Sequence, residues 1–393
     1  MNKDYIYLSL FLCFTLHSIN LYAQCPSFAT ILRTQSDVDS FQLKYPDCQH
    51  LEGELYLGAL SFSDSSSNIK NLNGLLQLSR INGGVSMIRL DSLVHADGLN
   101  NVEYIGGDLF IKFSEKLKGL RGFSSLDTIS GSLVVENCDS LESMLGLDSL
   151  SFIGNDISIV SNGNLRSLNG LENITMSGGS IFLRDLPLLS SLDGLQNLEH
   201  VGGFYEIDET GISNFSGMEK LRMVDRLLDI DENVNLLTLE GLNNVDSLGG
   251  ALRVVNNSSL MDCSVLCRLI TEGKIEGNIS ILFNASGCSN IQEIIEDGCF
   301  ISTSNPMDQS LNFEVFPNPA ESQIYLRSSY GDLPEVKVII RNAQGNTIVE
   351  LACPRIYDNT DFEIDLNSYQ AGIYYISIFN QNGVQSKSFT VIK

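Results

Sequence analysis

The chain has 393 residues, a formal net charge of −24 at pH 7 and a sequence pI of about 4.4. Its length is sufficient for two domains together with a targeting segment. The acidic balance argues against nucleic acid and anionic lipid surfaces as partners, since both bind basic proteins.

An apolar stretch at residues 5–23 comes first and ends at Ala23, a small residue of the kind that precedes signal cleavage. We therefore predict a Sec signal peptide at 1–23, with the mature chain beginning near Gln24. Gln24 also argues against lipid attachment at Cys25, because a lipid-modified cysteine needs a small residue before it. No later segment approaches about 18 consecutive apolar residues, so we expect no transmembrane segment.

Residues 34–45 have the pattern of a short amphipathic helix that begins at Ser36 and ends before Pro46. Cys25 and Cys48 flank this segment, and in an exported chain they are expected to form a disulfide. A reactive thiol pair is the alternative. We interpret the closed segment as a cap over a repeat stack, because terminal repeats need a cover.

The region 51–260 repeats one pattern eight times, in which a glycine is followed by an apolar residue. These glycines are Gly74, Gly98, Gly122, Gly146, Gly170, Gly194, Gly217 and Gly241. The steps between them are 24 residues five times, then 23, then 24. A fixed period of this size is typical of a stacked repeat architecture.

Each repeat also contains a short strand, which is indicated by aliphatic residues at every second position, as at Leu109 and Ile111. A helical interpretation of later apolar positions such as Leu168 is disfavoured, since Gly170 would break the helix. One coil is too small to bury its own apolar side, so coils must stack. We predict a mainly β fold, a right-handed parallel β-solenoid of about 24-residue coils over residues 24–300.

The solenoid region resembles a receptor L domain, the leucine-rich β-solenoid of the insulin and epidermal growth factor receptors. The resemblance lies in Cys25, the helix, Cys48 and Leu51 to Leu57, and at the far end in the segment from Asp262 to Cys299. It covers residues 25–299 and implies a scaffold that binds other macromolecules. The repeats outnumber those of one such domain, and no cysteine-rich module or kinase follows, so receptor signalling is not expected.

Four cysteines near the end of the repeats allow three disulfide pairings. We favour Cys263 with Cys288 and Cys267 with Cys299, and a zinc site is the alternative. Export favours disulfides. Cys138 is expected to be a small buried residue at a corner, and Cys353 to be a spare thiol. The asparagines near corners are expected to bond backbone groups inside the coil; they are Asn137, Asn164, Asn169 and Asn256.

Residues 301–312 contain turn formers without periodicity and are interpreted as a linker. Five short alternating strands are predicted within 313–393, at 323–327, 335–341, 362–366, 372–379 and 387–392, which indicates a small antiparallel β-sandwich. This tail resembles the C-terminal sorting domain of the type IX secretion system of Bacteroidota. The resemblance rests mainly on Phe316, Pro317, Asn318, Pro319, Gly372 and Lys393. It implies Sec export, contact with the type IX machinery, and release or attachment to lipopolysaccharide on the surface of a Gram-negative bacterium.

The outward positions of the stacked strands are where we expect a binding site. One column is Ser86, Phe110, Val134, Ser158, Phe182, Glu206, Asp229 and Arg253; its neighbour is Ile88, Lys112, Glu136, Val160, Arg184, Asp208, Asp231 and Val255. An apolar patch beside a charged one is typical of a macromolecular interface. The candidate binding residues are Phe110, Val134, Phe182, Glu206, Asp208, Asp229 and Asp231. A loop covering the aromatic rings, or scattered surface residues, is the alternative interpretation.

The spacing of Asp229, Asp231, Asn233 and Glu240 is similar to a calcium loop, but Val234 stands where that loop needs glycine. The favoured interpretation is a solvated acidic stripe. Weak calcium binding at Asp229 and Asp231 is the alternative. No cofactor or other metal is expected.

No arrangement of catalytic residues stands out, because the 4 histidines lie in separate segments of the sequence. We predict a secreted or surface-attached, non-catalytic module of binding or adhesion, with a glycan or a protein as ligand. A structural surface spacer is the second hypothesis. An enzyme acting on glycans through Glu206 and Asp208 is the third, disfavoured because an open, flat setting does not raise a carboxyl pKa.

Overall fold

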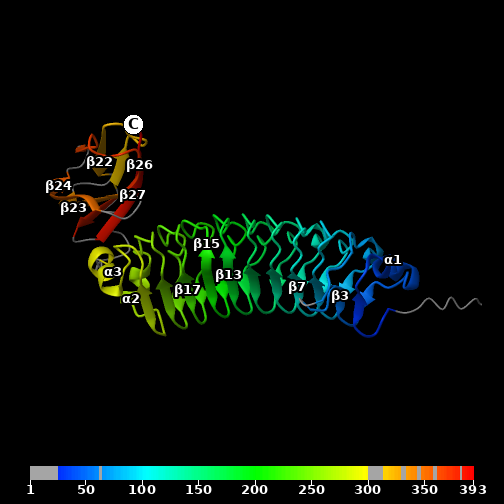
Figure 1. Ribbon diagram of the computed structural model, residues 1–393. Helices are drawn as coiled ribbons and strands as arrows, with labels where there is room; N and C mark the ends of the chain where they lie inside the picture. Colours follow the sequence, from blue (N-terminus) through cyan, green and yellow to red (C-terminus); the bar gives the residue numbers. More distant parts are fainter. Residues whose placement is uncertain are drawn as a thin grey trace, which may run out of the picture.

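The computed structural model describes residues 25–61, 64–299, 313–328, 333–342, 347–356, 361–380 and 383–393. The predicted signal peptide and linker lie outside these ranges. An elongated stack of coils fills 25–299, and a smaller sandwich formed by residues from 313 onward stands beside its C-terminal end (Figure 1). None of the helices in the described ranges combines the length and the apolar character that crossing a membrane requires.

Two parallel sheets run the length of the stack. The 11-stranded sheet consists of β1 (Thr30–Leu32), β3 (Leu55–Gly58), β5 (Val85–Ile88), β7 (Leu109–Lys112), β9 (Leu133–Glu136), β11 (Ile157–Val160), β13 (Ile181–Leu186), β15 (Tyr205–Thr210), β17 (Leu228–Asp231), β19 (Leu252–Val255) and β20 (Ile279–Leu282). The 9-stranded sheet consists of β2 (His50–Leu51), β4 (Arg80–Ile81), β6 (Tyr104–Ile105), β8 (Thr128–Ile129), β10 (Phe152–Ile153), β12 (Met176–Ser177), β14 (His200–Val201), β16 (Met223–Val224) and β18 (Ser247–Leu248). We call their outward surfaces the long-strand face and the short-strand face.

The strands pair in the register that the repeat predicts. Leu109 pairs with Leu133 and Leu133 with Ile157, so equivalent residues form one interior row. All three are buried, whereas the intervening Phe110 and Val134 point outward and are partly exposed. The predicted fold class, a parallel β-solenoid of about 24-residue coils followed by small antiparallel sheets, is therefore confirmed.

The repeat glycines are required by close approach between coils. Gly146 has φ 111°, and a Cβ atom there would overlap the carbonyl group of Leu120 in the preceding coil. Its N–H donates to the side chain of Asp148 at 2.8 Å, and Gly170 is capped in the same way by Glu172 at 2.8 Å. The polar residue two positions after the glycine is therefore part of the repeat signal.

Buried polar side chains form a ladder inside the stack. Asn233 accepts from the Thr210 backbone N–H at 3.0 Å and donates to the carbonyl groups of Ile207 at 2.9 Å and Asp231 at 2.8 Å. Asn257 and Asn162 bond in the same manner to the coils before them. Since the chain leaves the strand at this point, the amide groups satisfy backbone groups that the sheet ladder cannot reach.

The predicted corner asparagines do not belong to this ladder. Asn137 and Asn256 lie one residue earlier, at φ 54° and 59°, in the left-handed region that asparagine tolerates. Their side chains donate outward to Glu136 and Asp231. Asn164 donates to a carbonyl group on the exposed edge, and Asn169 bonds Ser167 through its backbone N–H.

Cys138 occupies a ladder position and is buried, as predicted. Its backbone N–H donates to the Asn162 side chain at 2.9 Å. Burial raises the pKa of its thiol to about 12, so the group stays protonated and unreactive. The side chain of Cys353 lies outside the described part of the chain.

Helices and disulfides close both ends of the stack. Helix α1 (Gln35–Lys44) begins after Thr34, which forms a capping box with Asp37, so the predicted start at Ser36 is one residue late. A disulfide joins Cys25 to Cys48. At the other end lie α2 (Leu266–Thr271) and α3 (Ile291–Gly298).

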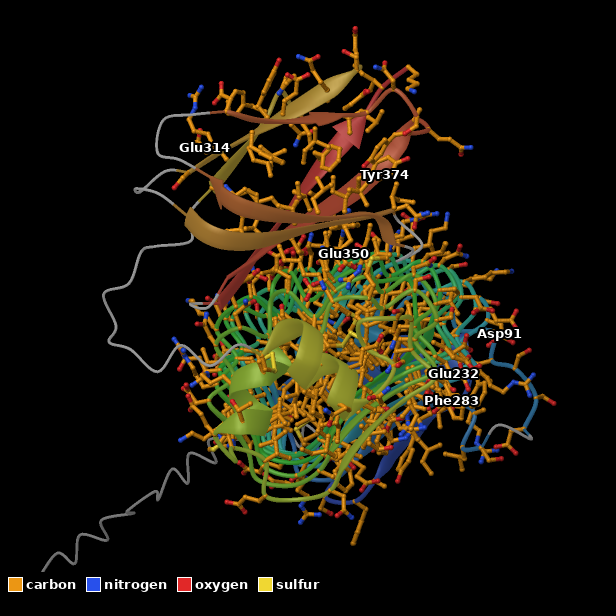
Figure 2. The ribbon with its side chains drawn as sticks, turned by 90° about the vertical axis from the view of Figure 1, so that its left-hand side faces the viewer. Asp91, Glu232, Phe283, Glu314, Glu350 and Tyr374 are labelled. Atoms are coloured by element: carbon orange, nitrogen blue, oxygen red, sulfur yellow. A yellow bond between two sulfur atoms is a disulfide. The ribbon has the colours of Figure 1, made fainter. Side chains whose placement is uncertain are left out.

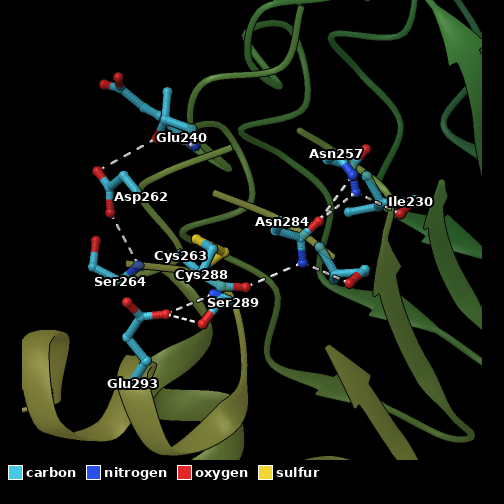
Figure 3. Close-up of a disulfide and its surroundings, with 12 residues drawn as sticks. Ile230, Glu240, Asn257, Asp262, Cys263, Ser264, Asn284, Cys288, Ser289 and Glu293 are labelled. Atoms are coloured by element: carbon cyan, nitrogen blue, oxygen red, sulfur yellow. Dashed lines mark hydrogen bonds between the residues drawn. A yellow bond between two sulfur atoms is a disulfide. The ribbon is translucent and has the colours of Figure 1, made fainter. Parts of the chain in front are cut away.

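The favoured pairings at that end, Cys263 with Cys288 and Cys267 with Cys299, are confirmed, which contradicts the zinc alternative. Figure 3 shows the first of these bonds beside Asn284, whose amide donates to the carbonyl of Cys288 at 3.1 Å and ends the ladder. The three closed loops span 23, 25 and 32 residues. Each disulfide is expected to contribute about 3 to 4 kcal/mol by restricting the unfolded chain.

The tail is a sandwich of two antiparallel sheets. One contains β21 (Phe313–Phe316), β22 (Gln323–Ser328) and β25 (Phe362–Asp365); the other contains β24 (Thr347–Ile356), β23 (Leu333–Asn342), β26 (Gly372–Asn380) and β27 (Gly383–Val391). Phe313, Ile376 and Phe389 are among the residues that fill its core. The sequence predicted five of these strands after the Phe-Pro-Asn-Pro segment but missed β24.

Candidate recognition face

The long-strand face carries both predicted columns. Phe182 pairs with Glu206 and Glu206 with Asp229 in the first column. Arg184 pairs with Asp208 and Asp208 with Asp231 in the second. Consecutive strands lie about 4.8 Å apart, so neighbouring members of each column lie side by side.

The aromatic half of the face lies on β7 to β13. Phe110, Val134, Val160 and Phe182 are partly exposed. The Lys112 ammonium lies 5.5 Å from the centre of the Phe110 ring, and the Arg184 guanidinium lies 4.8 Å from that of Phe182. The rings are therefore accompanied by cations of their own strands, at distances typical of cation–π contacts.

Ion pairs tie neighbouring strands together across the face. Lys112 pairs with Glu136 at 2.7 Å, and Arg184 pairs with Glu206. Arg253 bridges two carboxylates, with 2.8 Å to Asp229 and 2.6 Å to Asp231. Asp208, which lies between these pairs, makes no ion pair within the described residues.

Asp208 is unusual among these carboxylates. Burial, and after it the negative charges of neighbouring carboxylates, raise its pKa to about 6; these carboxylates are Asp231, Glu209, Glu206 and Glu232. The pKa of Asp229 is also raised by burial, although Arg253 acts against that shift. Negative charge thus accumulates around Asp208 without enough cations to balance it.

A third column continues this acidic region and was missed in the sequence. Asp185 and Glu209 are the next-to-last residues of β13 and β15, and Glu232 directly follows β17; their φ values are 50°, 51° and 53°, in the left-handed region. Burial and the neighbouring Glu232 raise the pKa of Glu209. Figure 2 shows Glu232 and Phe283, both corner residues, on the same flank of the stack. The signal was present, because these three acidic residues repeat with the same period as the two columns beside them.

Replacing Asp208 by asparagine should change how stability depends on pH. The folded-state pKa of about 6 lies above the ordinary 3.8, so the folded protein binds the proton more readily and loses stability as pH rises from about 4 to about 6. Asp208→Asn should therefore raise the melting temperature by a few degrees near neutral pH and leave it unchanged below about pH 4. Thermal unfolding followed by circular dichroism measures this, and a lower melting temperature at neutral pH would contradict it.

The residues whose spacing is similar to a calcium loop do not point toward a common centre. Asn233 points into the buried ladder, and Asp229 and Asp231 are both held by Arg253. In the described part of the chain, no group of three or more histidine, cysteine or carboxylate side chains is arranged to hold a metal ion. The acidic stripe is thus a surface feature joined by ion pairs.

Within the described residues, no histidine lies on the long-strand face beside its carboxylates. His200 lies on β14 of the other sheet, where its Nε2 atom is 2.8 Å from Asp225. His50 lies on β2 of that same sheet, and His95 in the bridge to Gly119. Glu206 and Asp208 are two residues apart on β15, and the first is engaged by Arg184. The prediction that their open setting does not raise a carboxyl pKa is wrong for Asp208, because burial and neighbouring carboxylates raise its pKa to about 6.

The residues of the predicted sorting motif lie at the ends of strands in the sandwich and in the segment that follows β21. Phe316 ends β21, with the Arg327 guanidinium 4.7 Å from its ring centre. Asn318 accepts from the Thr390 N–H at 2.9 Å, which fixes the Phe-Pro-Asn-Pro segment against β27. Gly372 begins β26, and Lys393 donates to the carbonyl of Asn367 at 2.8 Å.

Residues 314–393 match the family model of the secretion system C-terminal sorting domain. The chain is therefore exported by type IX secretion to the cell surface or the extracellular space. A search of curated proteins finds no match to the chain. The resemblance of residues 25–299 to receptor L domains remains a prediction.

Proposed function

We propose that this exported chain is a non-catalytic recognition module that binds an extracellular macromolecule, a glycan or a protein, on its long-strand face. The observation that carries the proposal is the arrangement of that face, where an aromatic half on β7 to β13 adjoins a charged half on β15 to β19. Aromatic side chains next to charged groups are typical of interfaces. Apolar residues scattered singly over a surface do not indicate a binding site.

The stack suits this role because the face is rigid. Its side chains stand on paired strands, and the strands stand on a core that is buried from Leu51 to Ile281. A surface that does not reorganise on binding keeps the entropic cost of association low. From β7 to β17 the face extends over five coil steps, about 24 Å, which is enough for a macromolecular contact.

The route of export supports an extracellular partner. We propose that a Sec signal peptide at 1–23 delivers the chain to the periplasm of a Gram-negative bacterium. The sandwich then engages the type IX machinery, and the mature protein is released or attached to surface lipopolysaccharide. A rigid stack with a disulfide at each end would also serve as a structural spacer, which is the second candidate.

The test is a thermal-shift screen of the full mature chain against a panel of glycans and extracellular proteins. A ligand that binds the folded state should raise the melting temperature, by an amount that grows with ligand concentration. The double variant Phe110→Ser/Phe182→Ser should lose this rise while it keeps the unliganded fold. A panel without any shift would favour the spacer, and an unchanged shift in the folded variant would remove these residues from the site.

A further inference from the structure

The acidic half of the long-strand face carries more negative than positive charge. Seven carboxylates lie on β13 to β17 and their corners: Asp185, Glu206, Asp208, Glu209, Asp229, Asp231 and Glu232. The guanidinium groups of Arg184 and Arg253 are the cations paired with them in the described structure. A net charge of −5 therefore remains, which is the seven carboxylates less the two guanidinium groups.

This excess is concentrated on side chains without cation partners. Glu206, Asp229 and Asp231 contact arginine, but Asp208 and Glu209 do not contact a cation in the described residues. Asp208 pairs in register with Asp231, so the following Glu209 and Glu232 are also neighbours, about 4.8 Å apart along the stack. Like charges at this separation destabilise each other, and a cation bound between them would relieve the repulsion.

The apolar half lies directly beside this region. Phe182 pairs with Glu206, so the aromatic column becomes the acidic column at one strand boundary. A partner that crosses the boundary meets apolar groups on one side and carboxylates on the other. The distance of about 24 Å from β7 to β17 corresponds to an extended polypeptide of about seven residues.

We propose that the long-strand face binds a basic polypeptide segment, with apolar side chains against Phe110 and Phe182 and lysine or arginine side chains at Asp208, Glu209 and Glu232. The inference rests on the proposed function and specifies the partner. Charge complementarity favours this partner over a neutral glycan, which would leave the carboxylate repulsion in place. It also favours it over a metal ion, because the described carboxylates do not converge on one point.

The experiment uses the full mature chain and a fluorescent synthetic peptide of about seven residues, with leucines at one end and lysines at the other. Fluorescence anisotropy should show saturable binding that weakens about tenfold when NaCl is raised from about 50 to about 300 mM. The double variant Asp208→Asn/Glu209→Gln should weaken binding by about tenfold or more. The matched control Glu103→Gln/Glu199→Gln changes the net charge equally at exposed positions beside β6 and β14 and should bind as the wild type does.

Absence of saturable binding would overturn the proposal, and so would equal loss in the control variant or equal binding of a peptide with glutamate in place of lysine. A panel ligand that needs Phe110 and Phe182 but ignores salt and the Asp208/Glu209 change would leave the proposed function standing and refute the basic partner. Melting curves of both variants establish that they are folded.

Discussion

Replacing Gly146 by alanine is expected to lower the free energy of unfolding by about 4 kcal/mol, which is enough to disrupt the stack around β9 and β11. The residue has φ 111°, a conformation that costs an L-residue about 1 to 2 kcal/mol. The added Cβ atom would also overlap the Leu120 carbonyl, and relieving an overlap with fixed backbone costs about 1 to 3 kcal/mol more. Urea unfolding of the full mature chain measures the sum.

Two other glycines separate these contributions. Gly273 has φ 64° but would place its Cβ in open space, so Gly273→Ala should cost only the conformational part, about 1 kcal/mol. At Gly119 the nearest atom to a Cβ is 3.9 Å away and φ is not in the left-handed region, so Gly119→Ala should be close to neutral. If Gly146→Ala were no more destabilising than Gly273→Ala, close stacking would not be what the repeat glycine serves.

Replacing Asn233 by alanine is expected to cost about 3 to 5 kcal/mol. The change would leave the Thr210 N–H and the carbonyl groups of Ile207 and Asp231 without their amide partner, and at least two of these bonds are buried. A buried polar group without a partner costs about 1 to 3 kcal/mol. Urea unfolding again provides the measurement.

Asn244 is the matched control for this change. Its amide donates to the Glu219 carbonyl at 2.7 Å, between coils as in the ladder, but the bond is exposed. Water can replace it, so Asn244→Ala should cost less than about 1 kcal/mol. Equal effects at the two positions would show that burial of the ladder is not what stabilises the stack.

The sequence predicted the strand register and both outward columns because the period is nearly constant. A side chain that repeats every 23 or 24 residues must lie over its equivalent, as Phe182 does over Ser158. The disulfides were predictable for a related reason, since the cysteines stand at the ends of the stack, where loops need closure. The sandwich was predictable from the resemblance of its first segment and its alternating strands.

The details of the face could not be obtained in this way. Arg184 contacts Glu206, whereas Arg253 bridges Asp229 and Asp231. Rotamers and local burial determine such pairings, and the period does not. The left-handed corner was missed because Asp185, Glu209 and Glu232 have no glycine to signal a positive φ. Two of the four asparagines expected to bond inside the coil, Asn137 and Asn256, lie one residue before the ladder positions 138 and 257.

The most direct test of the long-strand face is a comparison of matched pairs of substitutions on the two faces. Phe110→Ser/Phe182→Ser lies on the long-strand face, and Phe152→Ser/Met176→Ser removes the side chains that are 46% and 45% exposed on the short-strand face. The dissociation constant of the strongest panel ligand should rise about tenfold or more for the first pair and stay within about twofold of the wild type for the second. A larger loss for the second pair, in folded protein, would contradict recognition by the long-strand face.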